Sequence, residues 1–155
     1  MKGNEKILAT LNNLLADELT AISQYMVHSE MCDNWRYAKL HKAIEERAIT
    51  EMKHAEKLIA RILFLDGTPV VSNLKKINIG ADIESQFKND LDAEYGAVKG
   101  YNDGIRIAYE LNDNGSRELM DSILTDEEEH VDWLEAQQAQ IKDMGLQAYL
   151  VEQVD

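Results

Sequence analysis

The sequence predicts an all-α protein: a four-helix bundle with one long crossover connection and a short C-terminal fifth helix. Apolar residues recur at steps of three and four along four long segments, which is the period of one helix face. The chain has one Pro and only 8 Gly, so few residues interrupt helices of that length. The links between the segments are short, long and short. A chain of 155 residues is most simply one domain, and we expect a single domain over 1–155.

The first two helices are expected at residues 4–34 and 36–65, joined by a tight link. Their inward stripes keep the helical period but hold ionisable residues at core positions, Glu18 on the first helix and Glu51 with His54 on the second. The stripes are Ile7, Leu11, Leu14, Glu18, Ile22 and Tyr25, then Leu40, Ile44, Arg47, Glu51, His54, Leu58, Ile62 and Leu65.

The third helix is expected at residues 83–111, after Asp82 as a good N-cap. The fourth is expected from Ser116, because the run N-D-N-G at 112–115 breaks the pattern. Ionisable residues again lie near the middle of each stripe. The stripes are Ile83, Phe87, Asp90, Glu94, Val98, Tyr101, Ile105 and Ala108, then Met120, Ile123, Glu127, His130, Leu134, Gln137 and Ile141.

Residues 66–81 form the long connection, because D-G-T-P at 66–69 ends the second helix. A helix of about 28 residues is about 40 Å long, and an extended segment of about sixteen residues covers roughly 50 Å. The connection can therefore run the length of the bundle. The last segment, L-Q-A-Y-L-V at 146–151, is expected to form about two helical turns, too few to be stable alone. Its apolar residues dock either on neighbouring subunits or on their own bundle.

Residues of metal-ligand type repeat at matched distances on these stripes. In each half of the chain, one Glu is followed 33 residues later by a Glu-x-x-His pair, whose members share a helix face. The six residues are Glu18, Glu51, His54, Glu94, Glu127 and His130. Taken singly, each is more often a salt-bridged or hydrogen-bonded core residue, but six in register predict a site.

The chemistry of this set favours two divalent ions. Four buried carboxylates are untenable without compensating charge, and two divalent ions would neutralise them. Carboxylate with imidazole and no thiolate suits iron, manganese or zinc. Glu51 and Glu127 are the best candidates to bridge both ions.

Tyr25 and Tyr101 each follow a single Glu by seven residues. For Tyr101 core packing is the simpler interpretation. For Tyr25 two further roles stay open, a hydrogen bond to a metal ligand and a redox role.

Composition excludes several other classes of function. The net charge of −13 argues against binding nucleic acid, whose phosphates such a surface repels. Cys32 is the only cysteine, so the chain forms no internal disulfide, which fits a reducing compartment. The first residues are charged where a signal peptide needs an apolar core, and no stretch is apolar enough to span a membrane. We expect a cytoplasmic protein with no membrane partner.

Longer motifs resemble the bacterioferritin family over essentially the whole chain. They are M-K-G at the start, L-x-x-E-L-T-A-I-x-Q-Y at 15–25, E-M-K-H-A-E at 51–56, R-I-L-F-L-D-G at 61–67, D-E-E-E-H-V-D-W-L-E at 126–135 and M-G-L-Q-A-Y-L at 144–150. The resemblance implies a ferritin-like bundle that assembles from dimers into a hollow shell of 24 subunits and stores ferric mineral. It also implies a di-iron ferroxidase centre in each subunit that uses O₂ or H₂O₂, and haem b shared between two subunits.

The resemblance assigns a role to each ligand-type residue. Glu18 and His54 match the terminal ligands of one iron, Glu94 and His130 those of the other, and Glu51 and Glu127 the bridging pair. Met52 matches the axial haem ligand, with one sulfur from each of two subunits. On the sequence alone, Met52 points about 100° away from the ligand stripe and is an outer interface residue. A small iron–sulfur ferredoxin is the expected reductant for iron release.

Two alternatives and one departure from the family remain. Some members carry a His and an Asp on the inner face of the second helix, where this chain has Glu46 and Thr50. An inner iron site of that form is therefore in doubt. A rubrerythrin-like peroxidase is a second hypothesis, although such proteins often carry a Cys-rich domain and this chain has one cysteine. A purely structural shell with salt-bridged Glu and His is a third.

Overall fold

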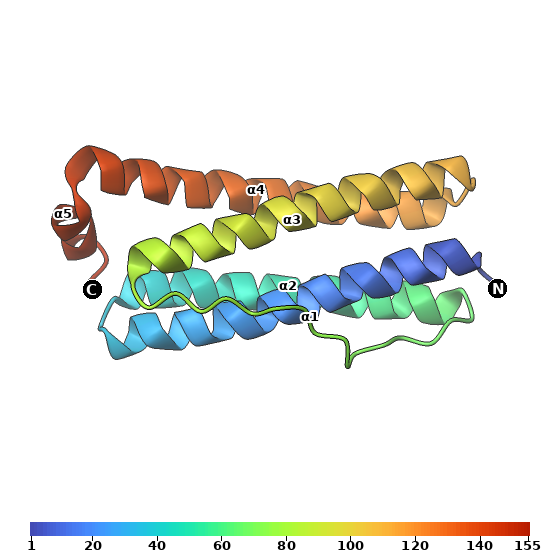
Figure 1. The fold of residues 1–155 in the computed structure, drawn as a ribbon, viewed down its shortest axis with the longest axis horizontal. Helices are drawn as coiled ribbons and strands as arrows, with labels where there is room; N and C mark the ends of the chain where they lie inside the picture. Colours follow the sequence, from blue (N-terminus) through green and yellow to red (C-terminus); the bar gives the residue numbers. More distant parts are fainter.

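The computed structural model describes residues 1–155 and confirms the all-helical bundle. Its four long helices are α1 (Glu5–Asn34), α2 (Ala38–Phe64), α3 (Ile83–Glu110) and α4 (Asn114–Met144), and α5 (Leu146–Val151) is the short last helix. Figure 1 shows α1 with α2 and α3 with α4 as two antiparallel hairpins, and α5 at the end of the bundle opposite the N-terminus. None of the helices combines the length and the apolar character needed to cross a membrane.

Local polar residues set the helix boundaries. Asn4 caps α1, and Asp82 caps α3 in a reciprocal capping box with Ser85, as the prediction for Asp82 required. The fourth helix begins at Asn114 and not at Ser116, because the side chain of Asp113 accepts a hydrogen bond from the Ser116 amide and starts the helix inside the predicted breaker run. The second helix begins at Ala38, two residues later than predicted.

The long crossover runs along α1 and is held by a row of α1 side chains (Figure 1). Each of these side chains accepts a hydrogen bond from a backbone amide of the crossover. The pairs are Asn12 with Val70 at 2.8 Å, Thr20 with Lys75 at 2.8 Å, Gln24 with Asn78 at 3.0 Å and His28 Nε2 with Gly80 at 2.9 Å. The four residues lie on one side of α1 at intervals of eight, four and four. The irregular backbone of the crossover thereby finds partners that water would otherwise supply.

The row ends in a buried polar network. His28 is fully buried, and because its Nε2 accepts from Gly80, its Nδ1 carries the proton and donates to Asp90 at 2.8 Å. Gln24 donates to the same oxygen at 2.8 Å. A Cβ on Gly80 would lie 2.3 Å from the Gln86 amide nitrogen, so only glycine allows this close approach to α3.

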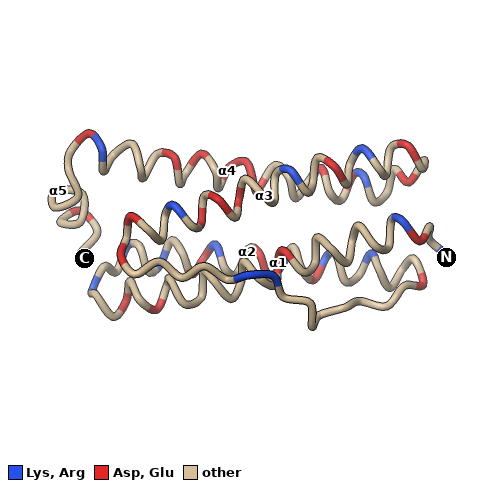
Figure 2. Tube along the Cα trace, in the orientation of Figure 1, with Lys and Arg blue, Asp and Glu red and all other residues tan.

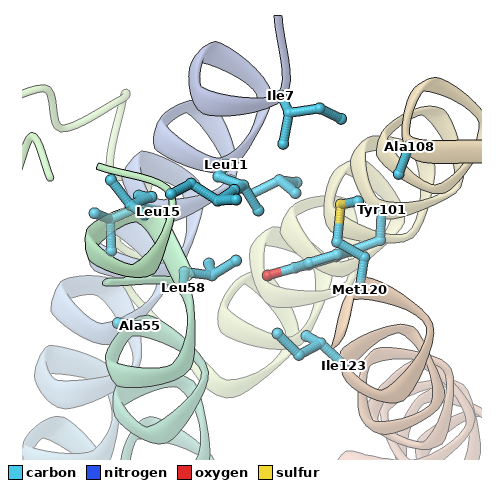
Figure 3. Close-up of a cluster of buried hydrophobic side chains, with 12 residues drawn as sticks. Ile7, Leu11, Leu15, Ala55, Leu58, Tyr101, Ala108, Met120 and Ile123 are labelled. Carbon is cyan, nitrogen blue, oxygen red and sulfur yellow. The ribbon is translucent and has the colours of Figure 1, made fainter. Parts of the chain in front are cut away.

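The apolar core consists of two clusters at the two ends of the bundle. One is drawn in Figure 3 and includes Leu11, Leu58 and Ile123; the other includes Phe87, Leu134 and Tyr149. Tyr149 belongs to α5, is fully buried, and donates a hydrogen bond to Gln137 at 2.6 Å. Of the two docking modes open for the last segment, the structure therefore shows the one on its own bundle. The layer between the two clusters is polar.

Candidate metal centre

The polar layer holds all six predicted ligand-type residues, one or two from each long helix. Each lies on the inward face that its stripe predicts, because side chains three or four residues apart on a helix share one face. All six are buried: Glu18, Glu51, His54, Glu94, Glu127 and His130.

Their ligand atoms form two groups, each within 4.8 Å. Glu18, Glu51, His54 and Glu127 form the first group, and Glu51, Glu94 and His130 form the second. Glu51 belongs to both, as a bridging residue must. Glu127, the other predicted bridge, belongs only to the first group.

Each hairpin supplies a tyrosine to the glutamate of the other hairpin. Tyr25 of α1 donates to Glu94 of α3, and Tyr101 of α3 donates to Glu18 of α1 at 2.5 Å. Burial, and then the charge of the partner carboxylate, raises the pKa of each phenol well above its ordinary value, so both remain protonated donors. Tyr101 also packs in the core, where Figure 3 shows its ring extending from α3 toward the middle of the bundle. Its hydrogen bond was not predicted.

The two histidines present Nδ1 to the carboxylates. His54 Nδ1 lies 3.2 Å from Glu51, 3.0 Å from Glu127 and 3.5 Å from Glu18. Its Nε2 meets Asp126 at 2.8 Å, the kind of outer carboxylate that orients a metal-ligating imidazole. Burial lowers the pKa of His54, but its hydrogen bonds to these carboxylates outweigh burial and raise the pKa to about 12.

His130 completes the second group. Its Nδ1 lies 2.8 Å from Glu94 Oε1, and its ring stacks on Trp133 with 5.9 Å between the ring centres. The sequence assigned no role to either Asp126 or Trp133. Both lie within four residues of a predicted ligand on α4, which is the only signal the sequence offers for them.

Protons compensate part of the negative charge. Burial, and then the charge of Glu51, raises the pKa of Glu18 well above its ordinary value; burial raises the pKa of Glu127 in the same way, beside Glu94. Burial also tends to raise the pKa of Glu51 and Glu94, but hydrogen bonds with neighbouring groups outweigh burial and lower the pKa of both. Without metal, these shifts favour one proton for each pair of neighbouring carboxylates, Glu18 with Glu51 and Glu94 with Glu127.

Arg47, a stripe residue to which the sequence assigned no role, supplies a further positive charge. Its Nη2 lies 2.7 Å from Glu51 Oε1, and the head group is within ion-pair distance of Glu94 and Glu127 as well. Burial lowers the pKa of Arg47, but the charges of these three carboxylates outweigh burial, so the net shift is upward.

Four carboxylate oxygens in this layer are buried and accept no hydrogen bond. They are Glu18 Oε2, Glu51 Oε1, Glu94 Oε2 and Glu127 Oε1. Buried acceptors are rarely left this way, because each lost hydrogen bond carries a desolvation cost. Hard divalent ions bind such oxygens, so the residues present fit a metal centre.

A cavity of about 480 Å³ connects these carboxylates to the surface between α1, α3 and the crossover. Glu18, Glu51, Glu94 and Glu127 line its inner part, together with Tyr25. Its outer part includes Lys75 and Lys76, the basic stretch of the crossover that is blue in Figure 2. Lys75 pairs there with Asp17 of α1. The cavity therefore leads from the surface toward the layer, whose ligand oxygens are themselves buried.

Met52 points away from this layer, as expected. It is 45% exposed on the outer face of α2, and the same hairpin also exposes the apolar residues Met26, Val27 and Ile49. Glu46 and Thr50 are linked to each other, since the Thr50 hydroxyl donates to the Glu46 carbonyl at 3.1 Å.

Comparison with known proteins agrees with the fold. The family described as a ferritin-like domain matches residues 8–144. Curated bacterioferritins align over 96% of this chain: that of Rhodobacter capsulatus is 42% identical over 92% of its own length, that of Mycobacterium leprae 38% over 94%, and that of Brucella melitensis 38% over 92%. The chain therefore belongs to the bacterioferritin family of ferritin-like proteins.

Proposed function

We propose that this protein stores iron, and that the buried layer is a ferroxidase site where Fe(II) is oxidised before ferric mineral forms. The observation that carries the proposal is the set of four buried carboxylate oxygens that accept no hydrogen bond of good geometry and lie beside two histidines at the inner end of a cavity. The name of the relatives, bacterioferritin, supports iron as the metal.

The proposed ligand roles follow the two groups. Glu18 with His54 holds one iron, and Glu94 with His130 holds the other. Glu51 bridges them, which its membership of both groups supports. Glu127 is proposed as the second bridge, because it adjoins Glu94 of the second group as well as His54 of the first.

Oxidation of two Fe(II) ions yields two electrons, which one O₂ takes up with two protons to give H₂O₂; alternatively, one H₂O₂ takes them up with two protons to give two waters. The protein holds the iron and manages its protons. Tyr101 and Tyr25 fix Glu18 and Glu94, and Asp126 fixes His54. The shared protons leave as iron binds, because ligands must be deprotonated.

An anaerobic titration with Fe(II), followed by air, tests the site. We expect two ions per subunit and their oxidation once air enters. Glu51→Gln should lower the stoichiometry, because it removes the residue common to both groups, whereas Glu56→Gln on the exposed side of α2 should leave it unchanged. Saturation well short of two ions per subunit, or Fe(II) that persists in air, would contradict the proposal.

We also propose the family's assembly: a single domain of residues 1–155, 24 subunits built from dimers, a cytoplasmic location, and haem b held by Met52 of two subunits. The outward, half-exposed position of Met52, on a hairpin that exposes further apolar residues, supports the haem position. A small iron–sulfur ferredoxin is the proposed electron donor for iron release. Light scattering tests the subunit number.

Haem binding has its own test. The purified protein should show a Soret band at one haem per two subunits. Met52→Leu should abolish the band, while Met144→Leu, which changes another exposed methionine, should preserve it. A Soret band that survives in Met52→Leu would remove Met52 as the ligand.

A further inference from the structure

Arg47 is the one side chain of permanent positive charge within the buried carboxylate layer. Its Nη2 lies 2.7 Å from Glu51 Oε1, 3.2 Å from Glu127 Oε1 and 3.7 Å from Glu94 Oε2. Glu51 is common to both groups of ligand atoms, Glu127 belongs to the first and Glu94 to the second. One guanidinium therefore faces both positions at which an ion would bind.

The guanidinium is held by charge more than by directed hydrogen bonds. Nε and Nη2 of Arg47 are buried without a hydrogen-bond partner of good geometry, although Nη2 is so close to three carboxylates. Its one directed bond runs from Nη1 to the Asp126 carbonyl of α4, at 3.2 Å. Its side chain is 11% exposed, so one edge reaches the surface between α2 and α4. The long flexible stem of an arginine allows its charged head group to reach water while the stem stays buried.

Arg47 and a metal ion would compete for the same oxygens. Glu51 Oε1, Glu127 Oε1 and Glu94 Oε2 are the atoms nearest to its Nη2, and they are three of the four oxygens that accept no hydrogen bond. A metal ion binds a carboxylate oxygen at roughly 2.0–2.2 Å. An ion at that distance would lie within a few ångströms of a like charge. Arg47 at its observed position and a metal ion at its usual bond length therefore exclude each other.

We propose that Arg47 is a displaceable counter-cation: it holds the carboxylates together in the metal-free protein, withdraws toward the α2–α4 surface when divalent ions bind, and thereby weakens and regulates their affinity. The inference rests on the proposed metal centre. A purely structural arginine would instead keep its ion pairs in both states.

Titration with Co²⁺, whose visible absorption reports its ligands, tests the inference on the whole protein. If Arg47 kept its place, repulsion between its unit charge and a divalent ion about 4 Å apart would correspond to roughly thirtyfold in affinity even at the dielectric constant of water. Withdrawal relieves this repulsion but gives up the ion pairs with the three carboxylates. We therefore expect Arg47→Gln to bind Co²⁺ about tenfold or more tightly than the wild type. The same change should lower the thermal midpoint of the metal-free protein, because the carboxylates lose their counter-ion.

Lys57→Gln is the matched control, since it removes one positive charge from an exposed position of the same helix. Equal tightening in Lys57→Gln and Arg47→Gln would overturn the inference, because net charge alone would explain it. Two ions in the wild type and the same affinity in Arg47→Gln would also overturn it, while leaving the metal centre in place. Failure of the wild type to bind Co²⁺ would overturn the centre itself, and this inference with it.

Crystal structures of the wild type with and without Zn²⁺ give a second measurement that needs no variant. We expect Arg47 Nη2 within 4 Å of the carboxylates in the metal-free crystal and withdrawn from them in the loaded one. A guanidinium in the same place with both ions bound would refute displacement.

Discussion

Replacement of Tyr101 by Phe should destabilise the metal-free protein more than the equivalent change at Tyr25. Glu18 accepts one hydrogen bond of good geometry, from Tyr101, and its other oxygen has no partner. Glu94 Oε1 accepts from Tyr25 but also faces His130 Nδ1 at 2.8 Å. Tyr101→Phe therefore leaves Glu18 with no donor nearer than His54 Nδ1 at 3.5 Å, whereas Tyr25→Phe leaves Glu94 with His130 Nδ1 at 2.8 Å.

The expected cost of Tyr101→Phe is about 1–3 kcal/mol, that of leaving a buried polar group unsatisfied, and that of Tyr25→Phe about 1 kcal/mol or less. For a chain of this size, each kcal/mol lowers the thermal midpoint by roughly 2–4 °C. Calorimetry of both variants at equal concentration, first without metal and then with Zn²⁺, measures the difference. We expect the gap between the two variants to narrow with Zn²⁺, because the metal then holds Glu18.

Two results would refute this reasoning. One is an equal or larger loss of stability in Tyr25→Phe. The other is an unchanged thermal midpoint in metal-free Tyr101→Phe, which would mean that Glu18 finds another donor or that the bond contributes nothing net.

Three further predictions concern the same layer and the crossover. The pKa of His54 is raised from about 6.5 to about 12, so the stability that this shift gives is complete below about pH 6.5 and is lost as pH rises toward 12. The thermal midpoint of the metal-free protein should therefore decrease when the pH is raised from about 7 to about 9. With Zn²⁺ bound this decrease should disappear, and a flat metal-free profile would contradict the assignment. Asp126→Asn should weaken Co²⁺ binding about 10–100-fold, because the His54 imidazole loses the carboxylate that orients it. Asp121→Asn, one turn earlier and exposed, should not weaken binding, and equal affinities of the two variants would remove Asp126 from the site. Asn12→Ala should speed amide hydrogen exchange in the crossover, whereas its exposed neighbour Asn13→Ala should not, and unchanged exchange in both would show that the row on α1 does not hold that segment.

The sequence predicted those features that depend on the period of a single helix. Glu18 and Glu94 had to face inward once their stripes were recognised, and Glu51 carried His54 to the same face by its spacing. The boundary at Asp82 was equally local, because an N-cap needs only the next three residues.

Several contacts that depend on two helices at once were not predicted. The contact of Arg47 with Glu127 and the contact of His54 with Asp126 depend on how far α2 and α4 are shifted along each other, which no single stripe encodes. His28 belongs to none of the predicted stripes, and it is buried with the amide of Gly80, in an irregular segment, as a partner. Periodicity contains no information about such a segment.

The crossed tyrosines make each hairpin depend on the other for its own glutamate. Glu18 of the first hairpin receives its proton donor from α3, and Glu94 of the second receives one from α1. If a single hairpin once existed as a separate gene product, two copies would have had to exchange these donors to build the layer, so the ancestor would have been an obligate pair. In this chain the crossover joins the two hairpins into one covalent unit. A chain cut within it should regain the layer only when both fragments are present.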